Sequence, residues 1–268
     1  MTTPNYILNY AAFTHPGKRF RQNQDALLLD GAVHQKAGFW HGTVLLDEMK
    51  RFAIADGAGG LPNAAAASRR LLQELAELDQ SRPQLLPRQR LIPLHNRLLK
   101  ICKSQRSFQN AGSTLITAEF APGGQMSLWH AGDSRGYHFG AQGLRQLTDD
   151  HTLAFCLGRS GKHSFANLKD FSMTNAGKAL DNLFIFSTDA EEPFIGLRLV
   201  KLMPGELLLM VSDGVTQYLT NEILEECLSG NDLVEGIKRI FDRVMTTEAE
   251  DNISALAMSL VSPNDDNP

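Results

Sequence analysis

The chain has 268 residues, of which 43% are hydrophobic and 21% are charged, as in soluble globular proteins. Its formal net charge of −4 gives no support for a nucleic-acid or anionic-membrane partner. The three cysteines, Cys102, Cys156 and Cys227, have neither redox nor metal-binding spacing, which favours a reducing compartment.

Strand-like and helix-like patterns alternate in the first half of the chain. Apolar runs predict strands at residues 6–13, 26–30, 42–46 and 51–55. We expect the last two to pair through a turn near Asp47 and Glu48. An Ala-rich run predicts a helix over residues 62–78. A second helix is predicted over residues 87–103, where Pro93 is either tolerated or marks the true start.

Strands dominate the second half. They are predicted at residues 113–120, 126–130, 135–139, 183–187, 197–202, 206–212 and 252–260. Turns at 122–124 and 132–134 are expected to join the first three strands. Short helices are predicted at 150–157 and 221–228, and a longer one at 232–245.

This order of elements predicts an α+β fold. Tight turns between sequential strands favour antiparallel sheets. Two such sheets packed face to face, with a helix pair on each outer side, give a four-layer α/β/β/α arrangement. The helices come in two pairs that fit the two outer layers.

One domain is expected over residues 1–268, because no linker or repeat is evident. Its core would cover about 6–260, with a tail at 262–268. The irregular segment 158–178 is long enough for a functional flap or lid, although a solvated basic insert fits it equally well. With no signal peptide or membrane-spanning stretch evident, we expect a monomeric cytoplasmic protein.

Three aspartates lie at the ends of apolar runs. Asp56 and Asp213 each follow a predicted buried strand, and Asp251 lies just before one. A carboxylate at the rim of a core strand is costly to desolvate unless a positive charge meets it. Each local motif alone is an ordinary turn. Three together, from distant parts of the chain, suggest a shared site for a hard divalent cation such as Mg²⁺ or Mn²⁺.

Seven short segments, taken in order, resemble the PP2C (PPM) family of metal-dependent serine/threonine protein phosphatases in its compact bacterial form. The segments are Asn23-Gln24-Asp25-Ala26, Asp56-Gly57-Ala58-Gly59-Gly60, Gly112-Ser113-Thr114, Gly132-Asp133-Ser134-Arg135, Leu147-Thr148-Asp149-Asp150-His151, Ser212-Asp213-Gly214 and Asp251-Asn252. Each is weak alone, but the shared order covers nearly the whole chain.

The resemblance implies a hydrolase that uses two Mn²⁺ or Mg²⁺ ions to activate water against phosphoserine and phosphothreonine in proteins. Asp56 would bridge the ions and the Gly57 carbonyl would complete one of them. Asp213 and Asp251 would complete the other, and Asp25 would hold water at the centre. These four aspartates are the catalytic residues that the resemblance predicts.

A third, weaker metal and a phosphate-binding arginine are also implied. Asp133 matches the family position that binds the third ion together with Asp213. The usual arginine position holds Phe20 here, flanked by Arg19 and Arg21. We favour Arg21 as the phosphate ligand, with Arg19 as the alternative, because a guanidinium fork suits phosphate oxygens.

Two departures leave a second function open. Gln24 replaces the glutamate of many members, and Ala58 replaces the histidine of animal members. Together with Phe20 and the unusual lid, Gln24 motivates the alternative of a catalytically weak, phosphatase-like binding or regulatory protein. As an enzyme, the protein would act on the substrates of a cognate Ser/Thr kinase in bacterial signalling.

A remote alternative is a serine hydrolase. Residues 132–136 match the G-x-S-x-G pattern with Ser134 as nucleophile. That pattern needs a helix directly after the serine, whereas residues 136–139 read as a strand. The triad would also need Asp149 or Asp150 with His151 or His163.

Overall fold

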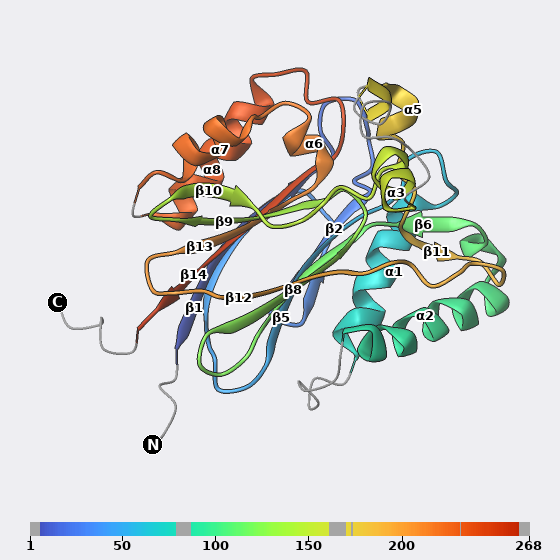
Figure 1. Ribbon diagram of the computed structural model, residues 1–268, viewed down its shortest axis with the longest axis horizontal. Helices are drawn as coiled ribbons and strands as arrows, with labels where there is room; N and C mark the ends of the chain where they lie inside the picture. The colour runs from blue at the N-terminus through green and yellow to red at the C-terminus, as the bar shows by residue number, and fades with distance from the viewer. Residues whose placement is uncertain (1–5, 79–86, 161–169, 173, 231, 263–268) are drawn as a thin grey trace.

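The computed structural model describes residues 6–78, 87–160, 170–172, 174–230 and 232–262. Two six-stranded antiparallel sheets stack on each other, and helices cover both outer faces (Figure 1). The predicted α+β class and four-layer α/β/β/α order are therefore confirmed. Within the predicted lid, residues 161–169 and 173 lie outside the described chain, as do residues 263–268 of the tail.

The two sheets have the same number of strands but different connectivity. The first sheet has the order β10 (Gly143–Gln146), β9 (Arg135–Gly140), β13 (Leu207–Val211), β14 (Ile253–Val261), β1 (Ile7–His15), β4 (Gly38–Leu45). The second has the order β12 (Gly196–Lys201), β8 (Gln125–Ala131), β7 (Leu115–Phe120), β5 (Lys50–Asp56), β2 (Asp25–Leu29), β3 (Ala32–His34). A small ladder joins β11 (Phe184–Phe186) to β6 (Ala111–Ser113).

One expected strand pairing is wrong, that of the strands predicted at 42–46 and 51–55. β4 pairs with β1 in the first sheet, whereas β5 pairs with β2 and β7 in the second. The predicted turn at 132–134 does lie between β8 and β9, and it leads from the second sheet to the first. An apolar pattern shows which faces of a strand are buried, but two stacked sheets offer two sets of partners for the same pattern.

The helices are α1 (Ala64–Ala76), α2 (Pro87–Ser104), α3 (Leu153–Arg159), α5 (Asn175–Lys178), α6 (Asp213–Thr216), α7 (Asn221–Leu228) and α8 (Leu233–Met245), with a 3-10 turn, η1, at Arg106–Phe108. Helix α7 has its predicted bounds, and α2 continues through Pro93. The Asp232 carboxylate caps α8 by accepting the backbone N–H groups of Val234 and Glu235. The short elements β3, β6, β10, α5, α6 and η1 were not predicted. None of the described helices is long and apolar enough to cross a membrane.

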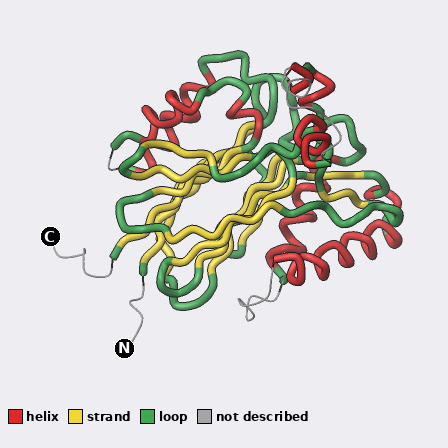
Figure 2. Tube along the Cα trace, viewed as in Figure 1, coloured by secondary structure: helices red, strands yellow, loops and turns green. Residues whose placement is uncertain are grey.

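Three apolar clusters fill the spaces between the four layers. One lies between the sheets, a second packs α1 and α2 on the second sheet, and a third packs α7 and α8 on the first sheet. Figure 2 shows the helices on opposite sides of the stacked strands. Every layer is therefore held to the next by buried apolar surface.

Strand β5 shows how this packing creates the functional edge. Phe52 and Ile54 belong to the cluster between the sheets, while Ala53 and Ala55 pack toward the helices. A strand buried on both faces reads as a continuous apolar run. Asp56, its last residue, is where that run ends at the edge of the sandwich.

Candidate metal centre

The predicted acidic residues meet at one edge of the sandwich. Asp25 at the start of β2 is the register partner of Asp56 at the end of β5. Asp213 begins α6, two residues after β13, and Asp251 lies two residues before β14, which is the neighbour of β13. Four carboxylates from distant parts of the chain are thereby brought to the same edge.

Asp25 is fully buried and held by two hydroxyl groups. Its Oδ2 accepts hydrogen bonds from Ser212 Oγ and Ser254 Oγ, both at 2.7 Å. Its Oδ1 has no hydrogen-bond partner among the described residues. Burial, opposed by the two hydroxyl bonds and reinforced by the charges of Asp213 and Asp251, raises the pKa of Asp25 to about 7.

Asp56 and Asp213 share the centre of this edge. Desolvation, followed by the charges of Asp25, Asp213 and Asp133 and a hydrogen bond with the Asp213 carboxyl group, raises the pKa of Asp56 well above its usual value. Asp213 Oδ2 accepts a 2.7 Å hydrogen bond from Gln217 Nε2. Asp213 Oδ1 is buried and lacks a hydrogen-bond partner within the described chain.

Asp133 and Asp251 flank the central pair. Desolvation and the charges of Asp213 and Asp150 raise the pKa of Asp133 to about 7. Desolvation and Asp213 also raise the pKa of Asp251, although its Oδ1 accepts the Asn252 backbone N–H at 2.8 Å. All five carboxylates are therefore electrostatically coupled, and Asp213 raises the pKa of each of the other four.

Two glycines allow the backbone to pack closely around these aspartates. A Cβ on Gly57 would lie 2.2 Å from the Ala64 carbonyl oxygen, and one on Gly214 would lie 2.0 Å from the Asn252 carbonyl oxygen. The Gly57 N–H donates to the Gln24 carbonyl oxygen at 3.1 Å. The Asp-Gly spacing recognised in the sequence thus has a steric cause at both places.

Thr14 and Ser254 help to order the site but were not identified from the sequence, whereas Asn23 and Asn252 belong to the matching segments and had no assigned role. Ser254 Oγ donates its only proton to Asp25. Thr14 Oγ1 is therefore the donor in the 2.7 Å hydrogen bond between Thr14 and Ser254. Asn23 Nδ2 in turn donates to Thr14 Oγ1 at 2.6 Å. Asn252 Oδ1 accepts the Gln24 backbone N–H at 2.9 Å. Polar residues inside a buried strand are a usable signal, because buried hydroxyl groups need partners.

The donor set fits a hard divalent cation. Carboxylate oxygens are the preferred ligands of Mg²⁺ and Mn²⁺. The buried acceptors Asp25 Oδ1 and Asp213 Oδ1 lack donors in the described chain, and the mutual repulsion of the carboxylates calls for positive charge. No three His, Cys, Asp or Glu side chains of the described residues already surround one ligating point. The fit therefore rests on oxygen chemistry and orphaned acceptors, not on a completed ligand shell.

A cavity of about 750 Å³ opens beside these carboxylates. Its lining includes Asp133, Asp213, Gln217 and Tyr218 from the acidic edge, and Thr152 next to α3. The cavity therefore lies between α6 and the residue that precedes α3, at one end of the sandwich (Figure 1). The space can admit a phosphorylated side chain next to the acidic edge.

The two candidate phosphate ligands have different surroundings. Arg19 forms an exposed ion pair with Glu250, 3.7 Å between Nη1 and Oε2, and its charge opposes part of the rise in the pKa of Asp251 that desolvation and Asp213 cause. Arg21 is exposed and lines a separate neighbouring cavity. Arg19 is thus the arginine that acts electrostatically on a predicted metal ligand, and the preference for Arg21 gains no support.

His151 orders the turn that carries Asp133. Its Nδ1 accepts the Gly132 backbone N–H at 3.2 Å and an Asn182 Nδ2 hydrogen bond at 2.8 Å. Its ring stacks on His130 with centroids 4.5 Å apart. Burial and the neighbouring His130 lower the pKa of His151 to about 4.

The Ser134 alternative lacks the required geometry. Ser134 is buried, and its Oγ lies 3.1 Å from Thr114 Oγ1. Strand β9 follows it directly, where a nucleophile elbow requires a helix. This excludes the elbow arrangement.

No family model matches the chain. Among curated proteins, it is 28% identical over 213 residues to the serine/threonine phosphatase Stp of Listeria monocytogenes, covering 76% of this chain and 81% of that protein. It is 24% identical over 265 residues to the serine/threonine protein phosphatase PstP of Mycobacterium tuberculosis, covering 97% of this chain and 46% of PstP.

Solved structures share the fold. The M. tuberculosis phosphatase PstP/Ppp aligns with a TM-score of 0.72 at 24% identity, over 94% of this chain and 98% of that chain. PppA of Pseudomonas aeruginosa aligns with a TM-score of 0.71 at 21% identity, over 95% and 98% of the two chains. The PstP catalytic domain solved in complex with two manganese ions gives 0.69 at 24% identity, over 96% and 100%.

Proposed function

We propose that this chain, which belongs to the PPM (PP2C) family, hydrolyses phosphoserine and phosphothreonine in proteins at a centre of two Mn²⁺ or Mg²⁺ ions. The observation that carries the proposal is the group of coupled carboxylates with two orphaned buried oxygens, Asp25 Oδ1 and Asp213 Oδ1. Such oxygens are satisfied when cations bind.

The metal-ligand roles are part of this proposal. The charges of both Asp25 and Asp213 act on Asp56, and we therefore assign Asp56 the bridging position. Asp213, with Asp251, would hold the second ion, and Asp133 would hold a third with Asp213. When bound, the ions would supply Lewis-acid stabilisation of the phosphoryl oxygens and acidify water. PstP, a relative solved with two manganese ions, supports this choice of metal.

The remaining residues orient the carboxylates and the phosphate. Ser212 and Ser254 fix Asp25 Oδ2, while the buried Oδ1 has no hydrogen-bond partner among the described residues and would be available to a cation. The absence of a Cβ on Gly57 lets the backbone after Asp56 approach α1. The electrostatic effect of Arg19 on Asp251 supports Arg19 as the phosphate ligand in this proposal, with Arg21 as the second candidate.

Gln24 is compatible with this function. Its backbone N–H donates to Asn252 Oδ1, and its carbonyl oxygen accepts the Gly57 N–H. These contacts do not depend on the side chain, so the change from glutamate to glutamine leaves them intact. The backbone contacts therefore favour neither the enzyme nor the weak, regulatory phosphatase-like alternative, and the Mn²⁺ experiments below distinguish the two.

We also propose that residues 1–268 form one monomeric domain that acts in the cytoplasm on the products of a cognate Ser/Thr kinase. The names of the relatives, all serine/threonine phosphatases, support phosphoprotein substrates. Size-exclusion chromatography with light scattering tests the monomer, and a dimer mass would contradict it.

The function is tested with a phosphothreonine peptide and Mn²⁺. We expect phosphate release that depends on Mn²⁺ and is lost in Asp56→Asn. Calorimetry with Mn²⁺ distinguishes the enzyme from the regulatory alternative. Metal binding without turnover supports the regulatory alternative. The absence of both metal binding and turnover at every metal concentration contradicts the proposed centre.

A further inference from the structure

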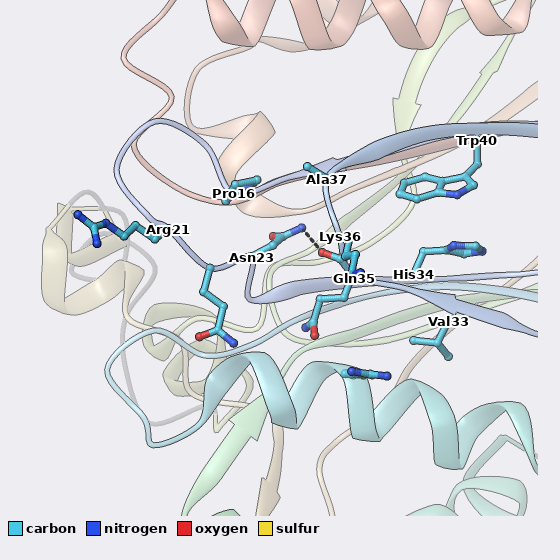
Figure 3. Close-up of a pocket in the computed structure, with 11 residues that line it drawn as sticks. Pro16, Arg21, Asn23, Val33, His34, Gln35, Lys36, Ala37 and Trp40 are labelled. Atoms are coloured by element: carbon cyan, nitrogen blue, oxygen red, sulfur yellow. Dashed lines mark hydrogen bonds between the residues drawn. The ribbon is translucent and has the colours of Figure 1, made fainter.

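A second cavity, of about 690 Å³, lies beside the loop that leads to Asp25. The loop before β2, the segment from β3 to β4, and α1 form its walls (Figure 3). The residues that the argument uses are Arg21, Asn23, His34, Gln35, Lys36 and Arg69, together with Trp40. This cationic cavity is distinct from the acidic cavity that Asp133 and Asp213 line.

The charges of the cavity have one sign. Arg21, Lys36 and Arg69 line it, and its described lining includes no Asp or Glu. All three cations are exposed, and none forms an ion pair with another described residue. In a chain with a net charge of −4, three unpaired cations around one space favour an anionic ligand.

The walls of the cavity are ordered by hydrogen bonds. Gln35 Nε2 donates to the Ala65 carbonyl oxygen at 2.6 Å and to Ser68 Oγ at 3.2 Å. Asn23 Nδ2 donates to the Gln35 carbonyl oxygen at 3.0 Å, a contact drawn in Figure 3. These bonds join the β3–β4 segment to α1 and to the loop before β2, so the cavity is formed before a ligand binds.

An aromatic pair forms the far wall. The rings of His34 and Trp40 have centroids 4.7 Å apart and are tilted by 43°. Both side chains are half-buried. In Figure 3, Arg21 extends away from this pair, on the other side of Asn23. A bound chain could therefore place aliphatic carbons on the rings and acidic groups near the cations.

Further hydrogen bonds of Ser68 and Asn23 connect the cavity to the candidate metal centre. Ser68 Oγ donates to the Gln24 carbonyl oxygen, which also accepts the Gly57 N–H. Asn23 is joined through Thr14 and Ser254 to the Asp25 carboxylate. The loop that carries Arg21 and Asn23 is thus shared by both sites.

We propose that this cavity binds an acidic segment of the phosphoprotein substrate that flanks the phosphorylated residue. The inference rests on the proposed phosphatase function. Aspartate and glutamate side chains complement Lys36 and Arg69, and the shared loop places both sites on one path for a peptide. The cavity then makes the enzyme select phosphorylation sites with acidic neighbours.

The test uses two phosphothreonine peptides that differ only in their flanks, Asp and Glu in one and Asn and Gln in the other. The ratio of kcat/KM for the acidic over the neutral peptide is measured for wild type, for Lys36→Ala/Arg69→Ala, and for a matched control. The control, Lys100→Ala/Lys103→Ala, removes two exposed cations of α2 outside the cavity.

We expect a wild-type ratio above one that falls about three- to tenfold in Lys36→Ala/Arg69→Ala, the effect of losing two exposed ion pairs. The ratio should also fall as salt concentration rises. The control should keep the wild-type ratio. A wild-type ratio of one, or an unchanged ratio in the cavity variant, overturns the proposal.

A binding measurement separates this inference from the proposed function. A fluorescein-labelled, unphosphorylated acidic peptide is titrated with each protein and followed by anisotropy. Weaker peptide binding by the cavity variant than by the control supports the peptide site, whether or not the proteins hydrolyse any peptide. Absence of hydrolysis in all the proteins would refute only the phosphatase function. Equal binding in both variants, or displacement by micromolar inorganic phosphate, overturns the peptide site.

Discussion

Asp25 and Asp56 are register partners across β2 and β5, so two carboxylates face each other at the end of the second sheet. Asp25 is fully buried, and the pKa of each carboxyl group is raised by the charge of Asp213. Without cations this arrangement opposes folding, because like charges are held together in a poorly solvated place. A site that costs stability in the metal-free state is expected where metal binding is the function.

Asp56→Asn should separate activity from stability. Removing one carboxylate relieves repulsion, so the metal-free variant should unfold at a temperature a few degrees above wild type. Its activity with Mn²⁺ should fall at least about 100-fold. Differential scanning fluorimetry also reports the stabilisation by Mn²⁺, which should shrink strongly in the variant. A metal-free variant less stable than wild type would contradict the repulsion argument.

Ser212→Ala and Ser254→Ala should each weaken metal binding. Each removes one 2.7 Å hydrogen bond to Asp25 Oδ2, and these bonds favour the charged carboxylate. Loss of such a supporting contact typically lowers metal affinity about 10–100-fold. Calorimetric Mn²⁺ titration measures it, with Ser259→Ala on the same strand, β14, as control. Unchanged affinity in both site variants would show that Asp25 needs no hydroxyl support.

Gly214→Ala should destabilise the fold around the metal centre. The added Cβ would lie 2.0 Å from the Asn252 carbonyl oxygen, so the turn after β13 would separate from the Asp251–Asn252 segment. We expect a loss of about 2 kcal/mol or more in urea unfolding, together with weaker Mn²⁺ binding. Gly59→Ala is the matched control, because its Cβ would meet nothing within 4 Å. Equal stability of the two variants would refute the steric argument.

The buried His151 should make stability depend on pH. Its pKa is about 4 in the folded protein and about 6.5 when unfolded. The unfolded state therefore binds the proton first, and the stability due to neutral His151 is lost as pH falls from about 6.5 toward 4. Asp25 and Asp133 act in the opposite sense, since their raised pKa values favour the folded state at low pH.

His151→Asn isolates this contribution, because its side-chain oxygen can still accept the hydrogen bonds from Gly132 and Asn182. Urea unfolding of the metal-free proteins is compared at pH 7.5 and pH 5. The variant should lose less stability than wild type over this interval. Equal losses in both proteins would show that His151 does not titrate as its buried environment requires.

The sequence allowed the strand ends to be located more reliably than the strand partners. The apolar run before Asp56 marks a strand buried on both faces, and this pattern is visible without a structure. The predicted pairing of β4 with β5 was wrong, because both strands turn an apolar face toward the same space between the sheets. Edge strand β10, with four residues and little burial, carries almost no pattern.

The site was predictable for its carboxylates but not for the groups that hold them. Aspartates beside glycines were recognisable as local motifs. The hydroxyl groups of Ser212 and Ser254 meet Asp25 only because β13 and β14 are neighbours, with Ser212 following β13. The cationic cavity depends in the same way on a residue of α1, Arg69, approaching the β3–β4 segment. Such contacts arise from tertiary structure and leave no spacing in the sequence.

The most direct test of the central claim is a Mn²⁺ titration of phosphothreonine-peptide hydrolysis by wild type and Asp56→Asn. We predict saturable, Mn²⁺-dependent phosphate release by wild type, and at least about a 100-fold loss of kcat/KM in the variant. Metal-independent hydrolysis, or full activity in Asp56→Asn, would contradict a metal centre built on these carboxylates.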